Sequence, residues 1–101
     1  MTSTPSLIQI LQQNKAYFQE RFGLESLVLF GCYAKNKQQE ESDVDLLYGV
    51  AMGNTMPLMR LQHLEQFISQ LVQVPKIELV SKNHVEPIIE LAIQKEGIVV
   101  F

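Results

Sequence analysis

The most informative pattern in the chain is Gly31-Cys32-Tyr33-Ala34-Lys35-Asn36, followed after a polar interval by Ser42-Asp43-Val44-Asp45-Leu46. The apolar run Leu27-Val28-Leu29-Phe30 precedes it and predicts a short strand buried on both faces. Gly31 ends that strand and, because it has no Cβ, lets backbone amides approach a phosphate closely. Cys32 and Lys35 could add a weak hydrogen-bond donor and a positive charge at the same place.

Asp43 and Asp45 are two residues apart on a second predicted strand, so their side chains project from the same face. Two adjacent carboxylates repel each other unless a cation lies between them. Divalent metals commonly bridge such carboxylates to phosphate oxygens in phosphoryl and nucleotidyl transfer. A third carboxylate, Glu78, stands between Ile77 and Leu79 in an apolar strand. If that strand neighbours the second one, Glu78 completes a cage of three carboxylates.

Each of these signals has a simpler interpretation when it is taken alone. A glycine after a strand is usually a turn, and Asp-x-Asp on a strand is usually a solvated edge. The metal-site interpretation rests on their combination, in which strand, glycine, polar loop, Asp-x-Asp strand and carboxylate-bearing strand follow one another in order.

The rest of the chain predicts a small mixed α/β (α+β) unit with a sheet of three or four strands flanked by helices. Pro5 opens the first helix, with Thr4 as its N-cap, and Gly23 follows its end. In chain order the predicted elements are a helix over 5–22, strands over 27–30 and 44–48, a helix from 57, a strand over 77–80, a helix over 87–96 and a docked apolar tail, 98–101.

Length and composition predict a single globular domain over residues 1–101, with 47% hydrophobic and 19% charged residues. The net charge of −3 and the lack of a basic cluster argue against direct binding of nucleic acid. No apolar run approaches the ~20 residues of a membrane helix, and no signal peptide is visible, so no membrane association is expected. Cys32 is the only cysteine, which favours a reducing cytoplasm.

With these residues in view, the chain resembles the minimal nucleotidyltransferases (MNT) of the DNA polymerase beta superfamily. Their signature is Gly-Ser, ten residues and Asp-x-Asp, often with Ala and a basic residue after Gly-Ser and Ser before the first Asp. The matching positions here are Gly31, Ala34, Lys35, Ser42, Asp43 and Asp45, with the spacing of ten kept. The family's third-strand pattern, Val-Asp-Leu-Val, aligns with Ile77-Glu78-Leu79-Val80.

The resemblance implies a nucleotidyltransferase fold and a Mg²⁺-dependent transfer of AMP from ATP to a hydroxyl of a partner protein. It carries metal ligation and catalysis onto Asp43, Asp45 and Glu78, and phosphate binding onto Gly31, Cys32 and, less directly, Lys35. The chain is similar to the antitoxins of HEPN–MNT toxin–antitoxin pairs, which makes a helical HEPN-type toxin the expected partner. Homo-oligomerisation stays open.

The sequence departs from the family pattern at three positions. Cys32 replaces the Ser hydroxyl with a weaker donor, Asn36 stands where the family has Gly, and Glu78 is one methylene longer than Asp. Asn36 is tolerable there, because Asn accepts a left-handed backbone better than most residues. Cys32 and Glu78 favour the alternative function, a protein of the same fold that has lost catalysis and neutralises its partner by contact. A free-standing enzyme acting on small molecules is disfavoured, because such enzymes carry a further helical domain.

A few other residues could contribute chemistry. Tyr33 lies in the loop and could contact a nucleotide, whereas Tyr17 and Tyr48 are most simply packing residues. No motif places His63 or His84 at a site.

Overall fold

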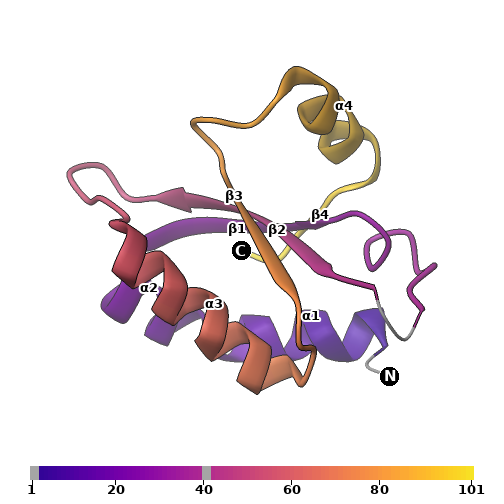
Figure 1. Cartoon of the computed structure of the whole chain (residues 1–101), viewed down its shortest axis with the longest axis horizontal. Coiled ribbons are helices and arrows are strands. Elements are labelled where there is room, and N and C mark those ends of the chain that lie inside the picture. The colour runs from indigo at the N-terminus through magenta and orange to yellow at the C-terminus, as the bar shows by residue number, and fades with distance from the viewer. Residues whose placement is uncertain (1–2, 40–41) are drawn as a thin grey trace.

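The computed structural model describes residues 3–39 and 42–101, so two residues of the N-terminus and two of the polar interval lie outside it. Figure 1 shows a four-stranded sheet with three helices on one face and a single helix on the other. In chain order the elements are α1 (Thr4–Gln13), α2 (Lys15–Phe22), β1 (Leu24–Phe30), β2 (Val44–Val50), α3 (Leu58–Val72), β3 (Ile77–Ser81), α4 (Pro87–Glu96) and β4 (Ile98–Val99). The predicted mixed sheet flanked by helices is confirmed.

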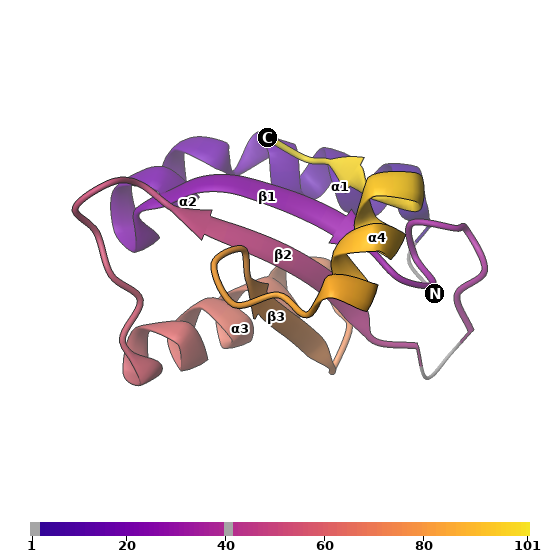
Figure 2. The same cartoon turned by 90° about the horizontal axis from the view of Figure 1, so that it is seen from above.

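The strands are ordered β3-β2-β1-β4 across the sheet. β1 pairs antiparallel with both β2 and β4, while β2 pairs parallel with β3. The parallel pair needs a crossover, and α3 supplies it by returning the chain along the face that α1 and α2 also cover (Figure 2).

The core lies between the sheet and helices α1–α3. Leu27 and Leu29 of β1 are fully buried, whereas the alternate residues Val28 and Phe30 are only half-buried. The prediction that this strand is buried on both faces is therefore wrong. Only α4 lies over the second face, and none of its side chains is buried (Figure 1).

The predicted first helix is two helices, because the chain breaks at Asn14. This residue leaves helical geometry at φ −104° and ψ 15°, and its side-chain amide donates to the Ile10 carbonyl at 2.8 Å. The helix begins one residue earlier than expected, with Ser3 as its N-cap, because the Ser3 hydroxyl accepts from the Ser6 amide at 3.3 Å. Gly23 ends α2 in the left-handed conformation, φ +67°, as predicted.

Thr4 is not a cap but a buried anchor for the loop that follows β1. Its hydroxyl donates to the carbonyl of Tyr33 at 2.6 Å, and only 6% of its surface is exposed. The Tyr33 side chain is itself 2% exposed and belongs to the core. The suggestion that Tyr33 could contact a nucleotide is therefore wrong, and its burial fixes the loop to the helical layer.

The C-terminal tail docks on the sheet, as the sequence predicted. β4 pairs with Val28 and Leu29, and the buried Val100 follows it. Phe101 then stacks against Phe18 with ring centroids 6.0 Å apart. None of the helices in the described part of the chain is both long and apolar enough to cross a membrane.

We predict that Thr4→Val lowers the free energy of unfolding by about 1–3 kcal/mol, since it leaves the buried Tyr33 carbonyl without its donor at nearly constant volume. Urea denaturation measures the change. Thr55→Val is the matched control, because Thr55 is exposed, and it should stay within about 0.5 kcal/mol of the wild type. Equal losses in the two variants would contradict the anchoring role of Thr4.

Candidate active site

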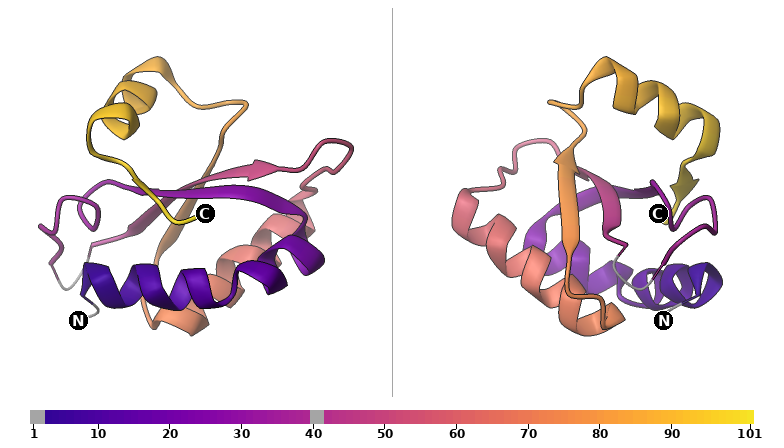
Figure 3. Two further views of the ribbon diagram at one scale, coloured as in Figure 1. Left: turned by 180° about the vertical axis from the view of Figure 1, so that it is seen from behind. Right: turned by 45° about the vertical axis from the view of Figure 1, so that its right-hand side comes forward.

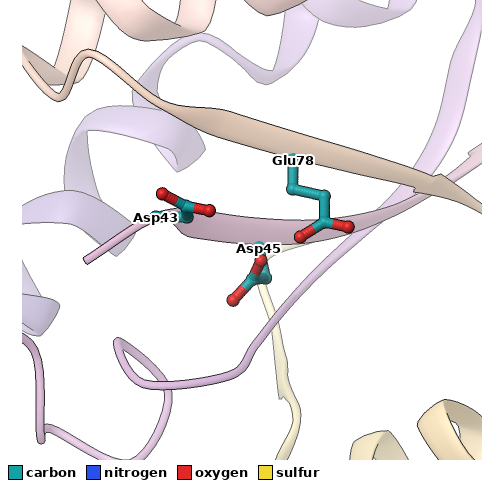
Figure 4. A group of neighbouring side chains, drawn as sticks. All are labelled: Asp43, Asp45 and Glu78. Carbon is teal, nitrogen blue, oxygen red and sulfur yellow. The ribbon is translucent and has the colours of Figure 1, made fainter. Parts of the chain in front are cut away.

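Three carboxylates converge on the face of the sheet opposite α1–α3. The parallel register of β2 and β3 places Asp45 directly across from Glu78. Asp43 precedes Asp45 by two residues and projects from the same side of the chain, as Figure 4 shows. One carboxylate oxygen from each residue lies within 4.8 Å of the others. The sequence-predicted cage of carboxylates therefore exists as a geometric arrangement.

The three side chains differ in their contact with solvent. Asp43 and Asp45 are half-buried, whereas Glu78 is exposed. Alternation along β2 explains this, because Val44 and Leu46 point into the core and so turn the two aspartates towards the opposite face.

Asp45 is the carboxylate whose proton affinity the fold changes most. Its pKa is raised from 3.8 to about 7, first by burial, then by a side-chain hydrogen bond with Glu78, and then by the negative charges of Glu78 and Asp43. This raised pKa means that ionising the Asp45 carboxyl in the folded protein costs free energy. A cation at this position would remove that cost.

The loop after β1 runs directly past Asp45. Phe30, the last residue of β1, pairs with Asp45 across the strands, and Gly31 follows at φ +77°. A Cβ at Gly31 would collide with the Asp45 carboxylate, so glycine is required both by the backbone conformation and by the close approach. The loop turns again at Asn36, φ +56°, a left-handed conformation that asparagine tolerates.

The other two residues expected to bind phosphate lie in this loop. The Cys32 side chain is exposed and free, and its carbonyl accepts from the Lys37 amide at 2.9 Å. Lys35 forms an ion pair with Glu96 at the end of α4, with Nζ and Oε2 3.1 Å apart. Both side chains are nearly half exposed, so the pair adds little stability. It does, however, link α4 to the loop.

Sequence reasoning missed two residues whose side chains contact this loop, Thr4 and Glu96. Thr4 was interpreted as a helix cap, and Glu96 carried no motif at all. Figure 3 shows why no local signal could reveal them, since α1 and α4 approach the loop from opposite sides of the sheet.

Known relatives resemble the chain over nearly its whole length. The model of the "Polymerase beta, Nucleotidyltransferase" family matches residues 12–101. A candidate protein adenylyltransferase from Methanocaldococcus jannaschii is 32% identical over 101 residues, which cover 99% of this chain and 100% of that protein. The protein adenylyltransferase MntA of Thermococcus cleftensis is 28% identical over 100 residues, with 99% and 98% covered.

Solved structures share the fold. A protein described as a minimal nucleotidyltransferase superposes with a TM-score of 0.75 at 23% identity, over 97% of this chain and 96% of that one. A toxin–antitoxin complex with AMP-PNP gives 0.70 at 16% identity, covering 89% and 72%. A complex of a tri-AMPylated Shewanella oneidensis HEPN toxin with its MNT antitoxin gives 0.61 at 19% identity, covering 92% and 71%.

We predict that, without metal, the Asp45 carboxyl makes the protein less stable as the pH rises. The folded state binds this proton more tightly than the unfolded chain, so the stabilisation is complete below the ordinary pKa of 3.8 and is lost as the pH rises to about 7. Asp45→Asn should flatten the slope of unfolding free energy over this window.

Urea titrations in EDTA at several pH values measure that slope. Glu25→Gln, which removes an exposed carboxylate of β1, is the control and should keep the wild-type slope. Parallel profiles for the wild type and Asp45→Asn would show that Asp45 does not hold its proton more tightly in the folded state.

Proposed function

Because the chain belongs to the polymerase beta nucleotidyltransferase family, we propose that it transfers AMP from ATP to a hydroxyl group of a partner protein. The observation that carries this proposal is the convergence of Asp43, Asp45 and Glu78 beside the Gly31 loop. The relatives named as protein adenylyltransferases support the choice of AMP and of a protein acceptor.

The three carboxylates suit Mg²⁺. This ion prefers oxygen ligands and is commonly held by one or two carboxylates together with substrate phosphates. The set here offers one oxygen from each side chain within a 4.8 Å cluster, and burial together with the hydrogen bond to Glu78 and the charges of Glu78 and Asp43 raises the pKa of Asp45 to about 7. Asp43, Asp45 and Glu78 would therefore hold the metal, which when bound neutralises the charge of the phosphates.

Other roles, namely triphosphate binding and acceptance of a proton, would fall to residues of the loop after β1 and to Glu78. The turn at Gly31 and Cys32 would bind the triphosphate through backbone amides and the thiol, and Lys35 would exchange Glu96 for a phosphate oxygen. Glu78, the exposed carboxylate, would accept the proton of the attacking hydroxyl. The hydroxyl oxygen then bonds to the α-phosphorus as the bond to the β-phosphate oxygen breaks, and pyrophosphate leaves.

The partner we propose is a helical HEPN-type toxin, which the chain would neutralise by AMP transfer. Support comes from the solved complex of a HEPN toxin with an MNT antitoxin, whose antitoxin has the same fold. The exposed, unpaired thiol of Cys32 supports a reducing, cytoplasmic setting for this pair.

We predict that ATP binds only with divalent metal and only when the carboxylates are intact. Calorimetry should show ATP affinity with Mg²⁺ that collapses in EDTA and in Asp43→Asn/Asp45→Asn. The control is Glu25→Gln/Glu65→Gln, which removes the same charge from exposed positions and should bind as the wild type does. Equal ATP binding by the two double variants would contradict the assignment of Asp43, Asp45 and Glu78 as metal ligands.

The second candidate function is a catalytically inactive protein of the same fold that blocks its partner by contact. Cys32 favours it, because a thiol donates a weaker hydrogen bond than the family's hydroxyl. Glu78 favours it because its additional methylene can displace the carboxylate from the position that the family's Asp would give it.

Substitutions that restore the family residues separate the two functions. If the protein is an enzyme, Cys32→Ser should raise AMP transfer by up to about tenfold, as ~1 kcal/mol of hydrogen bonding is regained. The measurement is radiolabel transfer from α-labelled ATP to a co-expressed HEPN-type protein, comparing the wild type, Cys32→Ser, Glu78→Asp and the double variant.

Background transfer in the wild type and both single variants, with activity only in the double variant, would instead establish the contact-only function. A fully active wild type that Cys32→Ser impairs would show that the thiol has a specific role of its own.

A further inference from the structure

A groove between α2 and α3 gathers basic and aromatic side chains away from the carboxylates. It has a volume of about 520 Å³, within the range of small-molecule sites. Its walls include Tyr17, Arg21 and Phe22 from α2 and Arg60, His63 and Phe67 from α3. Figure 3 shows the two helices on the same side of the sheet.

The charge of this groove is opposite to that of the whole chain. Arg21 and Arg60 are the only arginines in a protein of net charge −3, and both line it. Among the residues that the structure describes, no acidic side chain lines the groove, and Glu65 of α3 lies on the other side of that helix, against a separate polar hollow. Within the described residues neither arginine forms an ion pair. The groove therefore offers two permanently charged guanidinium groups to an anion.

Aromatic rings form another part of the wall, beside Pro57 and Met59. Tyr17 and Phe67 pack with centroids 4.7 Å apart, and Phe22 lies 6.1 Å from each of them. Tyr17 is 41% exposed whereas Phe22 is 7% exposed, so Tyr17 is the more accessible of these two aromatic residues. The Arg21 guanidinium lies 5.8 Å from the centroid of the same ring, which holds its charge beside the aromatic surface.

We propose that this groove is a second ligand site, which takes a nucleoside monophosphate. Guanidinium groups bind phosphate in a bidentate manner, and aromatic side chains stack on bases. A bare phosphate would leave the aromatic wall unused, and a neutral aromatic ligand would leave both arginines unpaired. One mononucleotide satisfies both features.

The groove is separate from the proposed catalytic site and does not depend on it. Asp43 and Asp45 stand at the start of β2. Residues 51–57 follow its other end and lead to the start of α3 (Figure 2), where Pro57, Met59 and Arg60 line the groove. About five strand residues, or ~17 Å, separate Asp45 from the end of β2. The two sites also occupy opposite faces of the sheet.

The test is an NMR titration of the ¹⁵N-labelled full chain with AMP in EDTA, which deprives the carboxylates of metal. We expect saturable shifts at Tyr17, Arg21 and His63, and an affinity that falls at least tenfold in Arg21→Gln/Arg60→Gln. The matched control Lys82→Gln/Lys95→Gln removes the same charge at exposed positions and should bind AMP as the wild type does.

Fragments of the ligand test its two halves. Adenosine and ribose 5-phosphate should each bind at least tenfold more weakly than AMP, and Tyr17→Leu should weaken AMP but not ribose 5-phosphate. Shifts confined to residues 31–45 would overturn the proposal by placing AMP in the catalytic site. Equal binding in the arginine variant, or ribose 5-phosphate binding as tightly as AMP, would overturn it as well.

Discussion

The parallel pairing of β2 with β3 makes Asp45 and Glu78 face each other, and the geometry of the carboxylate cluster depends on this contact between two acidic side chains. Burial, a side-chain hydrogen bond with Glu78 and the charges of Glu78 and Asp43 raise the pKa of Asp45 to about 7, so its ionisation in the fold costs free energy. The fold nevertheless keeps this pair, and glycine at position 31 leaves room for the Asp45 side chain. A cation beside these carboxylates would lower the cost of ionising Asp45. Such a conflict between stability and local chemistry is typical of functional sites.

The carboxylate cluster could be predicted because its geometry follows from local rules. Alternation along a strand places Asp43 and Asp45 on one face, and a strand-helix-strand order makes parallel pairing with the Glu78 strand the natural arrangement. The break at Asn14 could not be predicted in the same way. Leu11 and Phe18 are seven residues apart, or two helical turns, so the sequence pattern is that of one helix although the backbone forms two.

Other features depend on contacts between distant parts of the chain. The hydroxyl of Thr4 reaches the Tyr33 carbonyl across 29 positions of sequence, and Lys35 meets Glu96 only because α4 returns to the loop. No periodicity or motif indicates such contacts. From the sequence alone, each of these residues is of a type that is common on the surface of a helix or loop. The burial of Tyr33 has the same origin, since it depends on where the loop is anchored.

The geometry also bears on Cys32 and Glu78, the two departures from the family pattern that favour a protein without catalytic activity. An extra methylene at Glu78 would matter if it carried the carboxylate away from the aspartates, yet its oxygen lies within the same 4.8 Å cluster. Exposure of Glu78 leaves its side chain free to adjust to a ligand. A change of rotamer cannot compensate in the same way at Cys32, because a thiol is a weak hydrogen-bond donor in every rotamer. The argument for a contact-only function therefore depends on Cys32 far more than on Glu78.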